Sequence, residues 1–213
     1  MSGLLSLLNS DLGKEIIGGI SNETGTPETK TAETLDMALP LLVGAMKKNV
    51  QQPDGAASLM NALEAGNHDG SLLDNLGGFF GGGVDNNAMQ DGAGILGHLF
   101  GSKQPEVENA LSNKSGLNMD TISKILKVAA PLVLAYLAKQ KRQNNVQQAG
   151  DLNGLLGSML GGQPSHNQDM LTSLLDADGD GSFMDDVANM VVGNTKKRGG
   201  LGGMLDSLMG GNS

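Results

Sequence analysis

A segment of 35 residues occurs twice in this chain, and the second copy lies 91 positions after the first. Residues 15–49 align without a gap with residues 106–140, and nine of the aligned positions are identical. Each copy contains a matching glycine, Gly25 or Gly116, and a matching internal proline. Chance seldom reproduces both of these residues at one offset, so we interpret the chain as containing an internal duplication.

Each copy predicts a helix, a glycine stop and then a longer helix. Glycine suits the residue after a helix because it readily adopts the left-handed backbone conformation. After the stop, apolar residues recur at spacings of three and four, for example from Ile122 to Leu137. Pro40 and Pro131 fall within these long helices, where each should cause a kink, or else each begins a second helix after a break. We expect the two bent units to bury their apolar faces against each other about a pseudo-two-fold axis.

No segment shows the alternating pattern of a β-strand, so the sequence predicts an all-α fold. We expect a duplicated helical core over residues 1–145, with short helices between the copies. Residues 146–164 are interpreted as a glycine-rich linker with a short helix, and residues 165–193 as a helix-loop-helix. Residues 194–213 are expected to form a flexible basic and glycine-rich linker and a short apolar tail helix.

Composition excludes several classes of function. The chain has 14 basic and 23 acidic side chains, a formal charge of −9, which argues against a nucleic-acid partner because phosphates are neutralised by Lys and Arg. The absence of cysteine excludes disulfides, thiolate metal sites and a cysteine nucleophile. Tyrosine and phenylalanine total five residues, too few for an aromatic platform that stacks bases or sugars.

The most specific motif is an acidic loop over residues 176–186, between two apolar helical stretches. Its first seven positions follow the EF-hand pattern: oxygen side chains at positions 1, 3 and 5, glycine at 6, and a backbone carbonyl at 7. Five aspartates within eleven residues would repel one another without a cation. We therefore predict a structural Ca²⁺ site with the ligands Asp176, Asp178, Asp180, Ser182, Asp185 and Asp186.

The end of this loop departs from the EF-hand pattern. Position 12, normally a bidentate glutamate, is Val187, so either Asp185 or Asp186 would have to complete the coordination. The alternative is a polar turn in which Ser182 caps the following helix, with Asp185 three residues later. That cap is compatible with a bound ion. A signalling role is disfavoured because EF-hand sensors come in pairs and the chain has one such loop.

Other motifs carry little functional information. Residues 92–97 match GxGxxG, but no strand precedes them, and we interpret them as a flexible entry into a helix over residues 95–100. His68, His98 and His166 are isolated in the sequence, and a surface or capping role is favoured for each. No motif of a catalytic nucleophile or a phosphate-binding loop occurs in a suitable context. The sequence therefore predicts no catalytic residues and no cofactor other than Ca²⁺.

The N-terminus has neither the basic region nor the apolar length of a secretory signal, so we expect a cytoplasmic protein. The longest apolar run, Val128 to Ala138, is eleven residues long, which is typical of a core helix because a membrane span needs about 20. The basic cluster Lys196–Arg198 and the apolar residues after it could form a weak membrane anchor. A short docking helix is the favoured interpretation of this tail.

The segment from Gly94 to Ser102, together with the helix through Ala130-Pro131-Leu132-Val133, resembles the bacterial domain of unknown function 937. Residues 112–136 are also similar to the smaller YidB-like proteins, with the same glycine stop before a Leu- and Pro-containing helix. The resemblance covers about residues 1–145 and leaves the acidic loop as a C-terminal addition. It implies a helical fold and assigns no catalytic residues, because the family has no established activity.

These observations favour a non-enzymatic interaction or assembly protein with a structural calcium loop. Its partner would be another protein or a second copy of the chain. The alternative is an enzyme whose site is assembled from scattered residues, such as His68 and His98. Finding those histidines with carboxylates in one apolar pocket would favour the enzyme, whereas a broad exposed Leu/Met groove or a symmetric self-interface would favour assembly. Association with a membrane surface through the tail is a weaker alternative.

Overall fold

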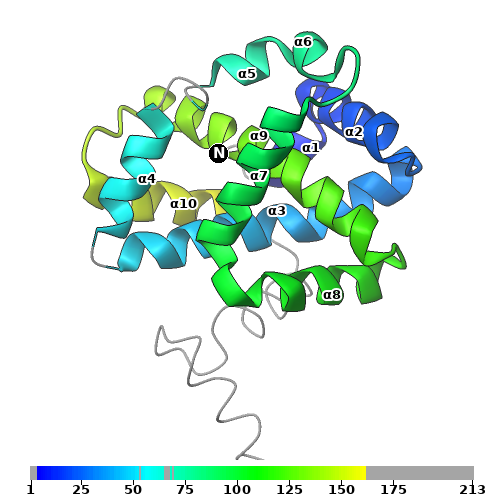
Figure 1. The fold of residues 1–213 in the computed structure, drawn as a ribbon. Helices are drawn as coiled ribbons and strands as arrows, with labels where there is room; N and C mark the ends of the chain where they lie inside the picture. Colours follow the sequence, from blue (N-terminus) through cyan, green and yellow to red (C-terminus); the bar gives the residue numbers. More distant parts are fainter. Residues whose placement is uncertain (1–3, 53, 65–67, 69, 162–213) are drawn as a thin grey trace, which may run out of the picture. The chain divides into compact units, whose positions relative to one another are not determined.

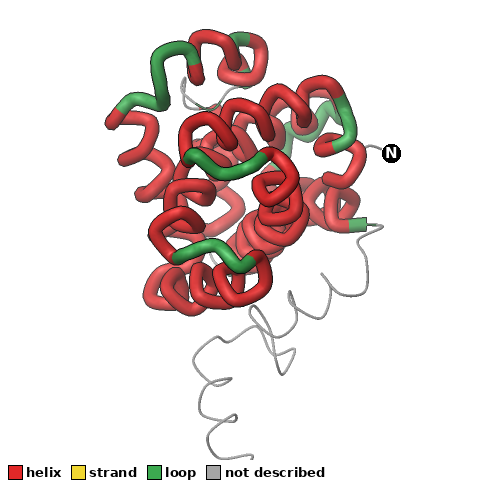
Figure 2. The backbone as a smooth tube through the Cα atoms, turned by 90° about the vertical axis from the view of Figure 1, so that its right-hand side faces the viewer, coloured by secondary structure: helices red, strands yellow, loops and turns green. Residues whose placement is uncertain are grey.

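The computed structural model describes residues 4–52, 54–64, 68 and 70–161, which all belong to one compact unit. Within these residues the predicted all-α fold is confirmed: helices are joined by short loops and no strand is present (Figures 1 and 2). The elements in chain order are α1 Leu4–Leu8, α2 Asp11–Thr24, α3 Glu28–Gln51, α4 Gly55–Glu64, α5 Ser71–Asp74, α6 Leu76–Phe80, α7 Asn86–Phe100, the 3₁₀ turn η1 Gly101–Lys103, α8 Gln104–Ser115, α9 Met119–Gln143, the 3₁₀ turn η2 Ala149–Asp151 and α10 Leu152–Leu160.

Two helix pairs, α2–α3 and α8–α9, correspond at the offset found in the sequence. α2 ends at Thr24 and α8 at Ser115, while α3 begins at Glu28 and α9 at Met119, so that both boundaries repeat after 91 residues. The glycine stops have φ values of 66° at Gly25 and 74° at Gly116, the left-handed conformation that lets a chain leave a helix.

The turns between the paired helices also use the same hydrogen bonds. The Ser21 hydroxyl donates to the carbonyl of Thr26 at 2.6 Å, and the Ser112 hydroxyl donates to the carbonyl of Leu117 at the same distance. The second pair adds an N-cap, because Asn118 accepts a hydrogen bond from the backbone N–H of Thr121 at 2.8 Å. The structural correspondence thus extends to individual turn contacts, while a common origin of the two copies stays a prediction from the sequence.

Pro40 and Pro131 both lie inside continuous helices, α3 and α9. The alternative in which each proline begins a separate helix is therefore wrong. Proline lacks an N–H, so Pro131 leaves the carbonyl oxygen of Lys127, four residues earlier, without its usual helical donor. Whether the prolines kink the helices stays a prediction.

The core lies where α3 and α9 pack against each other and against α2, α7 and α10. Side chains at equivalent positions of the two long helices are fully buried, including Leu35 with Leu126 and Met46 with Leu137. Burial of each leucine-sized side chain contributes about 1.5–3 kcal/mol to stability, so the packing of the two long helices is a major source of the fold's stability. α9 is also the one described helix that is long and apolar enough to cross a membrane, but 78 % of its apolar stretch is buried, as expected of a core helix.

α7 crosses α9 at very short range (Figure 1). The contact point is Gly92, which is buried and whose backbone faces the carbonyl oxygen of Lys127 so closely that a Cβ there would overlap it. This is the same carbonyl that Pro131 leaves without a helical donor. Glycine at position 92 is therefore a packing requirement, because no other residue permits this approach.

One local prediction needs correction. α7 begins at Asn86, with Asp85 accepting a hydrogen bond from the N–H of Ala88 at 2.7 Å, so the GxGxxG segment lies within a helix and is not a flexible entry.

Gly92→Ala should lower the free energy of unfolding by about 2 kcal/mol, the usual size of an overpacking penalty, because the added methyl group overlaps the Lys127 carbonyl. Gly97→Ala is the matched control, since Gly97 is in the same helix with open space around its Cβ position and should gain about 0.5–1 kcal/mol in helix propensity. Urea unfolding of both variants measures the difference. Equal effects of the two substitutions would contradict the close crossing.

Burial raises the pKa of Tyr136 above its usual value of 10.0, although a hydrogen bond with Gln140 acts in the opposite direction. Above about pH 10 the unfolded chain releases this proton while the folded protein retains it, so stability should fall as the pH rises towards the folded-state pKa. Tyr136 is the only tyrosine, so phenolate absorbance reports it directly. Tyr136→Phe should remove this part of the pH dependence, and a native-state titration midpoint at the usual value would contradict the prediction.

Candidate ligand-binding cavity

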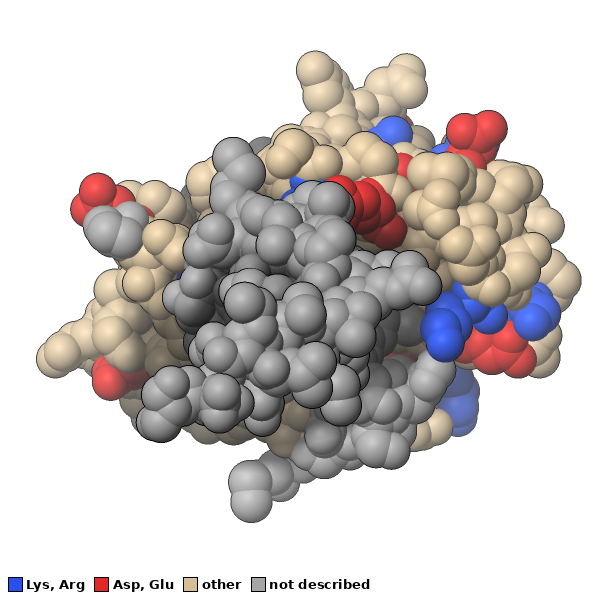
Figure 3. All heavy atoms as spheres, turned by 90° about the horizontal axis from the view of Figure 1, so that it is seen from below, with Lys and Arg blue, Asp and Glu red and all other residues tan. Residues whose placement is uncertain are grey.

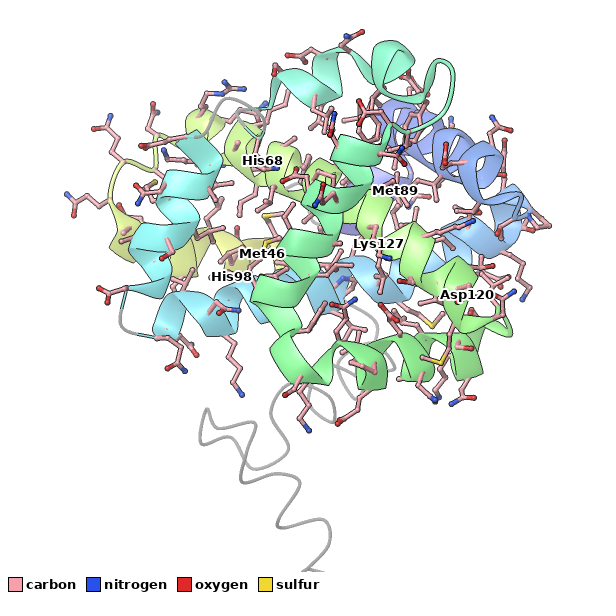
Figure 4. The ribbon with its side chains drawn as sticks, viewed as in Figure 1. Met46, His68, Met89, His98, Asp120 and Lys127 are labelled. Atoms are coloured by element: carbon pink, nitrogen blue, oxygen red, sulfur yellow. The ribbon has the colours of Figure 1, made fainter. Side chains whose placement is uncertain are left out.

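A cavity of about 620 Å³, partly open to solvent, lies between α4 and α7. Met46 and Asn49 of α3, Leu134 of α9 and His68, which lies between α4 and α5, complete its lining, and most of the surface it exposes is apolar. Figure 4 shows Met46 and His98 in the region between the two flanking helices. The volume is within the usual range of small-molecule sites, roughly 300–1,000 Å³, and the apolar lining with a few polar groups is also typical of them.

Two exposed ion pairs connect α4 and α5 to α9. Lys141 of α9 binds Glu64 at the end of α4 at 2.7 Å, and Lys139 binds Asp74 of α5 at 3.3 Å. Each pair contributes little energy because it is exposed. Together they nevertheless connect the segment that lies between the two repeated helix pairs to the long core helix.

The polar groups in the cavity are neutral or acidic. Within the described residues, no lysine or arginine lines it, and its one carboxylate is Asp91. The other polar side chains of the lining are Asn49, Ser58, His68, Asn87, Gln90 and His98. The electrostatic environment therefore favours neutral or positively charged ligand groups over anions.

His68 and Asp91 form the best-defined polar contact of the cavity. The Nε2 atom of His68 lies 2.7 Å from Oδ2 of Asp91, which joins residues 23 positions apart. The side chain of His68 is 10 % exposed, whereas that of Asp91 is 38 % exposed. Nδ1 of His68 is enclosed and has no hydrogen-bond partner among the residues that the structure describes. In the neutral ring with its proton on Nε2, His68 donates to Asp91, and Nδ1 is an acceptor.

The hydrogen bond between His68 and Asp91 is suited to orienting the Asp91 carboxylate rather than to transferring a proton to or from a ligand. A histidine that acts as a general base needs one nitrogen directed at the substrate. One nitrogen of His68 is bonded to Asp91 and the other is enclosed, so neither faces a cavity ligand. His98 is exposed on the same helix as Asp91. Within the described part of the chain, no group of three or more His, Asp or Glu side chains could hold a metal ion.

A second cavity, of about 540 Å³, lies beside the first and is more polar. It is lined by residues of α5, α6 and α7, with Pro131 from α9. Asn87 and Asp91 line both cavities. The exposed part of Asp91 is therefore at the boundary between an apolar and a polar space.

Charges on one face of the molecule are mixed. In Figure 3, Lys and Arg side chains lie beside Asp and Glu side chains in the area not covered by grey residues. That area has no uninterrupted basic patch of the kind that phosphate backbones require.

The structure brings two of the sequence-identified histidines, His68 and His98, into one mainly apolar cavity with a carboxylate. This is the arrangement expected of the enzyme alternative, although the enclosed nitrogen of His68 argues against proton transfer. The predicted calcium ligands Asp176, Asp178, Asp180, Ser182, Asp185 and Asp186 lie outside the described residues, as does His166.

Sequence reasoning missed Asp91 and its neighbours on α7. The signal was present as a helical stripe, because Asn87, Asp91, Gly94 and His98 are spaced by four, three and four residues. The helix predicted from the sequence began only at residue 95, so Asn87, Asp91 and Gly94 were not assigned to it. Recognising Asp85 as an N-cap would have placed Asp91 on the same face as His98.

Comparison with curated proteins and with solved structures finds no match to this chain. A family model described as "Bacterial protein of unknown function (DUF937)" matches residues 6–140, which is more than half of the chain. The matched region contains both repeated helix pairs almost completely and every helix that lines the two cavities. The chain therefore belongs to the DUF937 family of bacterial proteins of unknown function.

Proposed function

We propose that this protein is a non-enzymatic binding protein that holds a small molecule with an apolar body in the cavity between α4 and α7. The observation that carries the proposal is the cavity itself, with its volume of about 620 Å³ and its mostly apolar surface. Folded proteins rarely keep an apolar space of this size without use, because closing it would bury more surface and increase stability.

A binding role fits the polar groups better than catalysis does. The His68–Asp91 hydrogen bond leaves no imidazole nitrogen of His68 directed into the cavity. Asp91 retains exposed surface and can accept a hydrogen bond from a ligand. The enzyme alternative is supported by the presence of two histidines and a carboxylate in one cavity, but the His68–Asp91 contact provides no imidazole base from His68 that reaches a substrate.

The described surface gives less support to assembly through an apolar face. Met119, at 39 % exposure, is the one large apolar side chain that is exposed in the described part of the chain. An assembly interface usually has an apolar centre formed by several such residues. A protein partner or self-association, expected from the sequence, is therefore a separate proposal.

The calcium loop is a second and independent element of the proposal. The oxygen-rich pattern from Asp176 to Asp186 supports a structural Ca²⁺ site. The ion would stabilise its own segment rather than take part in ligand binding. The two elements therefore require separate tests.

Gly94→Leu should abolish binding of a neutral solvatochromic dye such as Nile red. Gly94 lines the cavity and a Cβ there meets open space, so the leucine side chain occupies the volume that a ligand needs. Gly97→Leu is the matched control in the same helix, with equally open space but outside the cavity lining. Dye fluorescence against protein concentration measures binding to each variant.

The expected result is saturable binding to the wild-type protein and to Gly97→Leu, with at least a tenfold weaker affinity for Gly94→Leu. Unchanged affinity of Gly94→Leu would place the dye elsewhere on the protein. Absence of saturable binding to the wild-type protein would contradict a ligand cavity between α4 and α7.

Calcium should raise the unfolding temperature of the full chain relative to chelator, with magnesium as the control ion. A ligand that binds only the folded state stabilises it by about 2.7 kcal/mol at 100 times its dissociation constant. Asp178→Ala and Asp180→Ala should remove the shift. If calcium changes neither the unfolding temperature nor the heat signal in titration calorimetry, the acidic loop is a capped turn.

A further inference from the structure

We propose that the ligand is an amphipathic amine, with its apolar body between α4 and α7 and its ammonium group at Asp91, where the two cavities meet. This inference rests on the proposed function, since it names the class of molecule that the cavity binds. Its basis is the arrangement of Asp91, Asn87 and the second cavity.

The position of Asp91 relates the two cavities. Asp91 and Asn87 are one helical turn apart on α7, and both contribute to the lining of the apolar cavity and of the polar one. A molecule that fills the apolar cavity can thus bring a polar head group to these two side chains. An amphipathic molecule matches this pair of spaces better than a molecule that is apolar throughout.

Charge complementarity selects the head group. Neither cavity is lined by a lysine or arginine in the described part of the chain, while Asp91 lines both and Asp85 lines the polar one. Desolvating an anionic head group beside two carboxylates without a compensating cation is unfavourable. An ammonium group finds an acceptor in Asp91, which His68 already orients through its other oxygen.

The helix N-terminus near this site does not reverse that preference. Exposed N–H groups at the start of a helix attract anions. At α7, however, the Asp85 side chain already accepts from the N–H of Ala88 at 2.7 Å and adds its own negative charge. The start of the helix is thereby neutralised by a carboxylate of the protein.

An aromatic side chain in the polar cavity also favours an ammonium head group. Phe79 lines the polar cavity and contacts Phe80 edge-to-face, with ring centroids 5.0 Å apart. Phe80 in turn packs against Gly19 of α2, which holds this aromatic pair in place. A cation close to the face of an aromatic ring is stabilised by the ring's quadrupole. Carboxylates and an aromatic ring in one cavity are groups that together favour an ammonium ion.

Three probes with one tail and different head groups test the inference: octylamine, 1-octanol and octanoate. Each is titrated against the complex of the full-length wild-type protein with Nile red. Octylamine should displace the dye at about tenfold lower concentration than 1-octanol, and octanoate should be the weakest competitor. This ranking is measured on the unmodified protein, so it does not depend on the folding of any variant.

Asp91→Asn then tests the residue itself, because asparagine keeps an oxygen that can accept from His68 and loses only the charge. In this variant octylamine and 1-octanol should compete equally. The control is Asp120→Asn, which removes one exposed carboxylate of α9 far from His68 (Figure 4) and should keep the wild-type ranking.

The results separate the two proposals. Suppose that Nile red binds and that Gly94→Leu prevents its binding. If the three probes then compete equally, or if octanoate competes best, the inference of an amine ligand is wrong and the proposed binding cavity is retained. An amine preference that survives Asp91→Asn also overturns that inference. If Nile red does not bind the wild-type protein at all, the result contradicts the proposed ligand-binding function itself, whatever the head group.

Discussion

The approach of α7 to α9 at Gly92 determines where the candidate site can form. The carbonyl oxygen of Lys127 has no helical donor, because Pro131 lacks the N–H that would bond to it. Only a glycine can bring its backbone this close to that oxygen. Asp91 is the next residue along α7, and Ile95 and His98 follow at about one-turn intervals. The contact therefore fixes the helix whose side chains form one wall of the cavity.

The repeated helix pairs and the segment between them have different roles. α2–α3 and α8–α9 end and begin at equivalent residues and bury equivalent side chains, and the packing of α3 against α9 forms much of the core. Residues 55–99, between the pairs, supply most of the cavity lining, while Met46, Asn49 and Leu134 come from the long helices. The repeats thus form much of the core, and the intervening helices supply most of the lining of the candidate site.

The parts of the fold that local chemistry specifies could be predicted from the sequence. Gly25 and Gly116 end helices because their conformation demands glycine, and the apolar spacing around Pro131 identified a core helix. The start of α7 was missed because its first turn is polar and solvated, so the apolar pattern there is weak. A cap at Asp85 was the better signal.

The cavity could not be predicted from the sequence, for a different reason. His68 and Asp91 are 23 residues apart and on different elements, and their contact depends on how α4 and α7 pack on α3 and α9. The same holds for the role of Asp91 at the boundary of two cavities. By contrast, the acidic loop from Asp176 to Asp186 is a local pattern that the sequence alone identifies.

The most direct test of a ligand between α4 and α7 is an isoleucine methyl NMR spectrum of the full chain during titration with octylamine. The isoleucines are Ile16, Ile17, Ile20, Ile95, Ile122 and Ile125, and of these only Ile95 lines the apolar cavity. The account predicts that the methyl signal of Ile95 shifts in a saturable way, while the signals of Ile122 and Ile125 in α9 stay in place. Saturable shifts at Ile122 and Ile125 with an unchanged Ile95 signal would contradict it.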